Sequence, residues 1–193
     1  MLVNENDEVV GVEEKLATHV RGALHRAFSI FVFNSTGFLL LQRRALSKYH
    51  SGGLWSNTCC GHPRLGESTQ AASHRRLYEE MGFDCDLHGT FAFVYYAELE
   101  GGLREHEYDH VLVGKFDGVP MPSSHEVDDW RWIDPRTLQI ELQQNPQMYT
   151  SWLRVAFDML WPRIESQIER NAEDLATNMS GMSDAWISLN SQP

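Results

Sequence analysis

Residues 61–82 read Gly-His-Pro-Arg-Leu-Gly-Glu-Ser-Thr-Gln-Ala-Ala-Ser-His-Arg-Arg-Leu-Tyr-Glu-Glu-Met-Gly. Its second half predicts a helix, because Ser68 or Thr69 can cap a helix start. The helix should end at about Met81, since glycine, here Gly82, is the usual residue after a helix C-terminus. The stretch therefore predicts a loop followed by one helix.

Two adjacent glutamates, Glu79 and Glu80, lie near the C-terminal end of this helix. Residues three and four apart on a helix are neighbours, so positions 76, 79 and 80 share one face. Carboxylates on that face would converge on a hard cation such as magnesium, and a diphosphate could bridge to the same ion. Two adjacent glutamates are, taken alone, more often a solvated helix face. The residues around Glu79 and Glu80 reverse that preference.

These residues resemble the Nudix box, whose pattern is glycine, five residues, glutamate, seven residues, then Arg-Glu-aliphatic-any-Glu-Glu-any-Gly. The chain matches all the spacings, with Gly61, Glu67, Arg75, paired glutamates and Gly82. The resemblance implies an α+β protein with the Nudix fold, in which a mixed β-sheet is sandwiched by helices.

One position departs from the pattern. Arg76 stands where the box has a glutamate, so a cation replaces a carboxylate that would help to hold catalytic magnesium. Hydrolysis of a diphosphate with several magnesium ions becomes less favoured, and binding of the intact diphosphate becomes easier. The box is therefore expected to hold a diphosphate without cleaving it.

The composition limits the class of protein. A chain of 193 residues with 42% hydrophobic and 22% charged residues is typical of a soluble globular domain. The apolar runs are too short to span a membrane, and the acidic N-terminus differs from a secretory signal. A net charge of −11 disfavours nucleic-acid binding, and three cysteines indicate reduced thiols. We expect a cytoplasmic protein whose oligomeric state stays open.

The rest of the chain alternates strand-like and helix-like segments. The expected elements are a hairpin of residues 27–33 and 38–41, a short strand over 54–60, a second hairpin of 90–98 and 103–116, a strand over 130–133 closed by Asp134-Pro135, and a helix over 149–168 with a kink or break at Pro162. Together they predict a single catalytic domain over residues 1–170. Residues 171–193 carry few aliphatic side chains and are expected to be a weakly ordered tail.

Three other segments resemble the isopentenyl-diphosphate isomerases within the Nudix superfamily. They are residues 43–48, 55–63 and 105–107, and the resemblance extends from about Lys15 to Trp152. The most specific run is Cys-Gly-His-Pro at 60–63. The resemblance implies an enzyme that interconverts isopentenyl and dimethylallyl diphosphate for isoprenoid biosynthesis.

Such a reaction needs an acid, a short-lived tertiary carbocation and a base that removes a different proton. The resemblance places the two proton-transfer groups at Cys60 and Glu107. We favour Glu107 as the proton donor, assisted by Tyr95, with Cys60 as the base, although reversibility leaves the direction open. Cys59 is expected to be a buried apolar residue.

Metal binding is the second requirement. Glu105 and Glu107 point to the same face of an extended strand, and His106 points away. The resemblance implies a metal site formed by His19, His25, His62, Glu105 and Glu107. Imidazole and carboxylate ligands are compatible with Mn²⁺, Zn²⁺ or Mg²⁺. The histidines that we expect to lie outside the site are His50, His74, His88, His106, His110 and His125.

The diphosphate requires a local basic cluster in an acidic protein. The resemblance assigns this role to Lys15, Arg44, Lys48 and Arg76. A Mg²⁺ ion bound with the diphosphate would be held by Glu80 and the backbone carbonyl of Cys60. Trp152 would place its indole face over the carbocation.

Two other functions remain compatible with parts of the sequence. A Nudix hydrolase acting on a nucleoside diphosphate derivative is favoured by the box but disfavoured by Arg76 and by the cysteine motif. A non-catalytic diphosphate-binding module is disfavoured by the presence of both Cys60 and Glu107.

Overall fold

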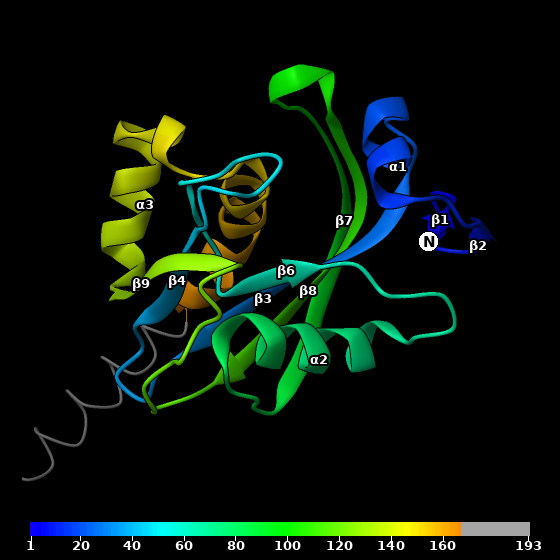
Figure 1. The fold of residues 1–193 in the computed structure, drawn as a ribbon. Coiled ribbons are helices and arrows are strands. Elements are labelled where there is room, and N and C mark those ends of the chain that lie inside the picture. Colours follow the sequence, from blue (N-terminus) through cyan, green and yellow to red (C-terminus); the bar gives the residue numbers. More distant parts are fainter. Residues whose placement is uncertain (167–193) are drawn as a thin grey trace, which may run out of the picture. The chain divides into compact units, whose positions relative to one another are not determined.

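The computed structural model describes residues 1–166, and in this part of the chain a nine-stranded mixed sheet combines with helices (Figure 1). The labelled helices are α1 (Lys15–Arg21), α2 (Thr69–Met81) and α3 (Pro135–Gln144), with 3₁₀ turns at Glu100–Gly102 and Pro146–Met148, and a further helix covers residues 151–166. The strands are β1 (Leu2–Val3), β2 (Val9–Gly11), β3 (His25–Phe33), β4 (Leu39–Arg44), β5 (Trp55–Ser56), β6 (Cys59–Gly61), β7 (Leu87–Glu98), β8 (Arg104–Lys115) and β9 (Val127–Ile133). The predicted α+β class is confirmed.

Helix α2 has the predicted bounds because both of its ends are capped. The side chain of Ser68 accepts a hydrogen bond from the backbone N–H of Ala71 at 3.1 Å. Gly82 adopts the left-handed conformation with φ of 74°, and its N–H donates to the carbonyl of Tyr78 at 3.0 Å. A Cβ atom at Gly82 would lie 2.2 Å from the carbonyl oxygen of Met121, so a larger residue does not fit there.

Strand β3 is the centre of the site region. It pairs in parallel with β8 along its whole length, and β6 pairs with its residues 28–30 in the antiparallel sense. Strands β7 and β8 form the second predicted hairpin. Side chains alternate between the two faces of these strands, so Phe28 and Ile30 join Met81 of α2 in the apolar core. The opposite face carries His25 and, on β8, Glu107.

The first predicted hairpin opens soon after its turn, where β4 leaves β3 and pairs with β9. Thr58 connects the separated strands, because its hydroxyl donates to the carbonyl of Leu40 at 2.7 Å and accepts from the N–H of Val32 at 2.9 Å. The prediction of one strand over residues 54–60 is therefore wrong. The segment is divided into β5, which pairs with β4, and β6, which pairs with β3.

Two helices, α1 and α3, are additional to the predicted elements. Asp134 caps α3 by accepting a hydrogen bond from the N–H of Thr137 at 3.0 Å, and Pro135 occupies the first turn. The Asp134-Pro135 pair, which we expected to close β9, thus also begins a helix.

The predicted helix over residues 149–168 starts at residue 151 and is helical as far as residue 166, where the described part ends. Pro162 does not break it. A proline removes its own backbone N–H bond, and the helix continues on both sides of that missing bond.

The chain divides into two compact units, Met1–Ala156 and Phe157–Pro193, a boundary that falls inside the expected single domain of residues 1–170. In the second unit, residues 157–166 are described and are helical. The expected tail at residues 171–193 lies outside the described residues. Within the described range, no helix is long and apolar enough to cross a membrane.

Candidate active site

Helix α1 brings Lys15 and His19 to the site, one helical turn apart. Glu14 caps this helix by accepting a hydrogen bond from the N–H of Ala17 at 3.0 Å. The Nδ1–H of His19 donates to the carbonyl of Lys15 at 2.7 Å, because a carbonyl can only accept. A neutral His19 ring therefore directs the lone pair of its Nε2 atom toward the interior of the site.

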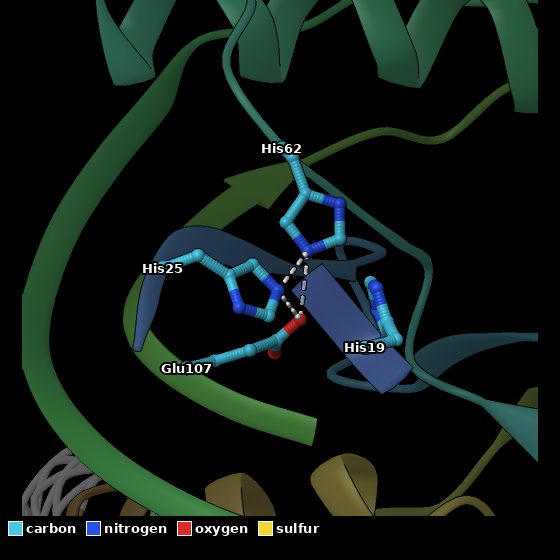
Figure 2. Close-up of side chains that lie close together, drawn as sticks. All are labelled: His19, His25, His62 and Glu107. Atoms are coloured by element: carbon cyan, nitrogen blue, oxygen red, sulfur yellow. Dashed lines mark hydrogen bonds and ion pairs between the residues drawn. The ribbon is translucent and has the colours of Figure 1, made fainter. Parts of the chain in front are cut away.

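His25, His62 and Glu107 meet on the polar face of the sheet (Figure 2). The parallel register places His25 opposite Glu107, and His62 follows directly after β6. The Nε2 atom of His62 lies 2.8 Å from Oε1 of Glu107 and 3.1 Å from Nε2 of His25. The Nδ1–H of His25 donates to the carbonyl of Ala23 at 2.9 Å, which leaves its Nε2 facing His62. Burial lowers the pKa of His62 to about 3, so its ring is neutral.

The arrangement of these donor atoms fits a metal ion. One donor atom from each of His19, His25, His62 and Glu107 lies within 4.8 Å of the others. Imidazole and carboxylate ligands bind zinc at about 2.0–2.2 Å in tetrahedral geometry, so their donor atoms are about 3.3–3.6 Å apart, and small side-chain adjustments would bring these four onto one ion. In addition, Nε2 of His19 and Oε2 of Glu105 lie 3.2 Å apart, and neither has a hydrogen-bond partner in the described part of the chain. The cluster could therefore hold a divalent metal.

Glu105 and Glu107 are both buried and face the cluster, whereas His106 bonds to the backbone at the end of α1 at 3.0 Å. This alternation agrees with the predicted strand. Burial and the charge of Glu107 raise the pKa of Glu105. Burial also opposes ionisation of Glu107, but the neighbouring His25 and His62 hold its pKa well below the usual range. A cation beside the two carboxylates would relieve their repulsion.

His50, which we expected to lie outside the site, is buried at its edge. Its Nε2 atom lies 3.5 Å from Oε1 of Glu105, and it forms a second possible metal-binding group with His19 and Glu105. The sequence signal that could have found it is its position two residues after Lys48, the expected phosphate ligand.

A cavity of about 300 Å³ opens beside this cluster. All four side chains of the predicted basic cluster line it, together with both glutamates of β8. The predicted residues in its lining are Lys15, Arg44, Lys48, Cys60, His62, Arg76, Glu80, Glu105, Glu107 and Trp152. His50 and Glu126 also line it.

Arg76 reaches the cavity from α2 beside Gly61. A Cβ atom on Gly61 would lie 3.1 Å from the ring of Phe28 and 3.3 Å from Cγ of Arg76, so the glycine leaves the space that the arginine uses. The guanidinium contacts the carboxylate of Glu80, whose Oε2 accepts a hydrogen bond from the amide of Gln42 at 2.9 Å. Arg76 is thus held beside the carboxylate that we expect to bind magnesium.

Glu126 joins two members of the basic cluster, a role that the sequence did not reveal. Its Oε1 lies 3.2 Å from the guanidinium of Arg76, and its Oε2 contacts the ammonium of Lys48. The residue directly precedes β9 and is far from both partners in the sequence.

Cys59 and Cys60 have opposite environments. Cys59 is fully buried in the apolar core, as predicted, and Cys60 lines the cavity. Burial, reinforced by the charges of Glu80 and Glu107, raises the pKa of the Cys60 thiol to about 12. The thiol therefore carries its proton near neutral pH.

Tyr95 and Trp152 approach the site from different elements. The hydroxyl of Tyr95 donates to Oε2 of Glu107 at 2.6 Å. The indole N–H of Trp152 donates to the hydroxyl of Ser56 at 2.9 Å, and the guanidinium of Arg44 lies 5.1 Å from its ring centre. Trp152 is thereby fixed at the wall of the cavity.

Comparison with known proteins identifies the family of this chain. Residues 23–153 match the NUDIX domain. The chain is 53% identical over 158 residues to isopentenyl-diphosphate Delta-isomerase 2 of Aromatoleum aromaticum, covering 82% of this chain and 84% of that protein. It is also 53% identical to the isopentenyl-diphosphate Delta-isomerase of Serratia proteamaculans, covering 79% and 85%. The chain belongs to the isopentenyl-diphosphate Delta-isomerase family. The matched Nudix region carries the site described above except for Lys15 and His19, which precede it on α1.

The solved structures that resemble this member of the isomerase family share its fold. DR0079 from Deinococcus radiodurans superposes with a TM-score of 0.68 at 20% identity, covering 82% of this chain and 96% of that chain. The MutT protein from Methanosarcina mazei Go1 gives a TM-score of 0.58 at 18% identity, covering 75% and 94%. These likenesses confirm the Nudix fold.

The structure of this isomerase-family protein brings all the predicted site residues into one region. Three of them, His19, His25 and Tyr95, do not line the cavity. They contact residues that do, which are Glu105, His62 and Glu107 respectively. The additional polar residues of the cavity lining are His50, Arg64, Arg75 and Glu126.

Proposed function

We propose that the protein is an isopentenyl-diphosphate Delta-isomerase, which interconverts isopentenyl and dimethylallyl diphosphate and supplies isoprenoid biosynthesis. The observation that carries the proposal is that Cys60 and Glu107 line one cavity from strands on opposite sides of β3. Moving an isolated double bond requires protonation at one carbon and deprotonation at another. Two groups on two sides of one substrate meet that requirement.

Cys60 and Glu107 exchange roles with the direction of the reaction. From isopentenyl diphosphate, the proposed order has Glu107 as donor, assisted by its contact with Tyr95, and Cys60 as acceptor. Near neutral pH the thiol of Cys60 holds its proton and Glu107 is ionised. This order therefore requires Cys60 to lose its proton and Glu107 to gain one before the substrate is protonated.

The basic cluster would hold the diphosphate. Lys15, Arg44, Lys48 and Arg76 line the same cavity as the proton-transfer pair, so a bound diphosphate would keep the five-carbon chain between them. A Mg²⁺ ion would be bound by Glu80 and the backbone carbonyl of Cys60. In the box, Glu80 and Arg76 would thus both bind an intact diphosphate, Glu80 through the Mg²⁺ ion.

The histidine and glutamate cluster would hold one further divalent ion, Mn²⁺, Zn²⁺ or Mg²⁺. The proposed ligands are His19, His25, His62, Glu105 and Glu107. When bound, this ion would fix the orientation and protonation state of Glu107. The mixture of imidazole and carboxylate donors supports tolerance for more than one metal.

Trp152 would stabilise the carbocation. An indole face beside a positive charge contributes about 0.5–2 kcal/mol. The hydrogen bond from Trp152 to Ser56 supports this role, because it holds the ring at the cavity wall.

The decisive test is the reaction in deuterated water with isopentenyl diphosphate and Mg²⁺, followed by NMR. Deuterium should enter the carbons that exchange protons, dimethylallyl diphosphate should form, and no phosphate should be released. Phosphate release in proportion to substrate, without isomer, would instead establish a Nudix hydrolase.

A further inference from the structure

His50 lies in the loop between β4 and β5, with a side chain that is only 5% exposed. Its Nε2 atom is 3.5 Å from Oε1 of Glu105, and its Nδ1 atom is 3.3 Å from the hydroxyl of Ser51. Its ring centre is 5.8 Å from that of His19 and 5.8 Å from that of Trp152. His50 therefore stands between the metal cluster and the cavity wall.

The neighbours of His50 decide which ring nitrogen carries the proton. A carboxylate that holds a cation only accepts hydrogen bonds, so with an ion on Glu105 the nitrogen of His50 that faces it carries the proton. The hydroxyl of Ser51 can then donate to Nδ1. This tautomer directs an Nε2–H group at Oε1 of Glu105.

The two oxygens of Glu105 face different neighbours. Oε2 lies 3.2 Å from Nε2 of His19, and both of these buried atoms lack a hydrogen-bond partner among residues 1–166. Because Nδ1–H of His19 is used by the Lys15 carbonyl, its Nε2 has one lone pair and can bind one ion. Oε2 of Glu105 and Nε2 of His19 would therefore face the same ion, and Oε1 of Glu105 would face Nε2 of His50 at 3.5 Å.

We propose that His50 is a positioning residue of the metal site, which orients Glu105 by holding Oε1 while Oε2 faces the ion. The inference rests on the metal site of the proposed function. Carboxylate ligands of metals are commonly held in this way by a neighbouring donor, and loss of the donor typically costs 10–100-fold in metal affinity. The contact of His50 with Trp152 also links the orientation of Glu105 to the wall of the substrate cavity.

The test compares metal binding in three variants of the full chain after removal of metal with a chelator. His50→Leu removes the donor and replaces the imidazole with an apolar side chain of similar size. His50→Gln keeps an N–H donor that can reach Glu105. His74→Gln is the matched control, because His74 also faces a carboxylate, Asp84 at 2.6 Å, but does so outside the cavity. Titration with Mn²⁺ gives the affinity, and the visible absorption of bound Co²⁺ reports the ligand geometry.

His50→Leu should weaken Mn²⁺ binding about 10–100-fold and change the Co²⁺ spectrum, since Glu105 loses its orientation. His50→Gln should recover most of the affinity, and His74→Gln should match the parent. If His50→Leu does not fold, His50→Gln is compared with Ser51→Gly. Loss of the Ser51 hydroxyl, which holds Nδ1 of His50, should weaken Mn²⁺ binding, whereas the glutamine should not.

Parental affinity and an unchanged spectrum in His50→Leu would overturn the role proposed for His50 and would leave the proposed metal site standing. A parent protein that binds no Mn²⁺ or Co²⁺ would overturn it together with the metal site. If isomerase activity is absent but metal binding still depends on His50, the inference stands and the proposed reaction fails.

Discussion

Cys59 and Cys60 differ only in which side of β6 they occupy. Successive residues on a strand face opposite ways, so one thiol enters the core while the other reaches the cavity. The same alternation places Glu105 and Glu107 in the site and His106 outside it. A single residue step therefore separates a packing role from a chemical one.

Replacing Cys60 with alanine should lower turnover by at least ~10²–10⁴-fold, because one of two proton-transfer groups is lost. Affinity for the diphosphate should change little, since the basic cluster remains. The measurement is steady-state turnover and substrate affinity at equal metal loading.

Cys59→Ala is the matched control for this prediction. It should keep turnover within a few-fold of the parent, while a small cavity in the core lowers the melting temperature. A well-folded but inactive Cys59→Ala protein, or a Cys60→Ala protein with parental turnover, would show that the wrong thiol has been assigned.

A bidentate ion pair between Glu67 and Arg75 ties the loop before α2 to the helix. The guanidinium of Arg75 donates to both oxygens of Glu67, at 2.7 and 2.8 Å, and the N–H of Arg64 donates to the same carboxylate at 2.8 Å. The hydrogen bonds from Arg75 lower the pKa of Glu67 from its ordinary value of 4.5 to about 2. The ionised carboxylate therefore stabilises the folded loop and helix.

Glu67→Gln should lower the melting temperature at pH 7. Because the pKa of the folded protein is below that of the unfolded chain, the contribution of Glu67 is fully present above about pH 4.5 and is lost as the pH falls toward about 2. The difference in melting temperature between parent and variant should thus stay constant from neutral pH to about pH 5 and shrink at lower pH.

Asp128→Asn supplies the comparison for Glu67→Gln. Asp128 pairs with Arg43 at 2.9 Å, but both side chains are well exposed, so its removal should have little effect. A Glu67→Gln effect that grows as the pH falls would contradict the role given to this ion pair.

On the scale of the molecule, the metal cluster joins elements that are far apart in the sequence. Its members come from α1, β3, the loop after β6, and β8. An ion held by all four would stabilise the folded protein, because the unfolded chain does not bring these ligands together. Metal binding and folding are therefore expected to be coupled.

Removing metal with a chelator should lower the melting temperature, and adding Mn²⁺ or Zn²⁺ should restore it. At a free metal concentration of about 100 times Kd, the expected stabilisation is about 2.7 kcal/mol. His25→Ala and His62→Ala should each abolish the metal-dependent part of the shift. A melting temperature that is independent of metal in the parent would exclude a site of this kind.

Local patterns in the sequence determined the parts of the protein that depend on neighbouring residues. Helix α2 was predictable because Ser68 and Gly82 cap it, and the alternation along β8 was predictable because a strand has a period of two residues. The family resemblance supplied the candidate site residues, since the Nudix box and the cysteine motif keep characteristic spacings. Asp134-Pro135 shows the limit of local patterns, because the same pair ends a strand and begins α3.

Only the tertiary structure decided which distant segments meet. Thr58 bonds to both β3 and β4, and so β6 takes the place beside the centre of β3 and carries Cys60 into the cavity. His50 enters the site because its loop lies against Glu105 of β8, and Glu126 enters it because its loop lies against Arg76 of α2. Both partners are remote in the sequence. Periodicity reports how a segment folds on itself. Contacts such as His50 with Glu105 depend on long-range strand pairing and burial, which no spacing within either segment specifies.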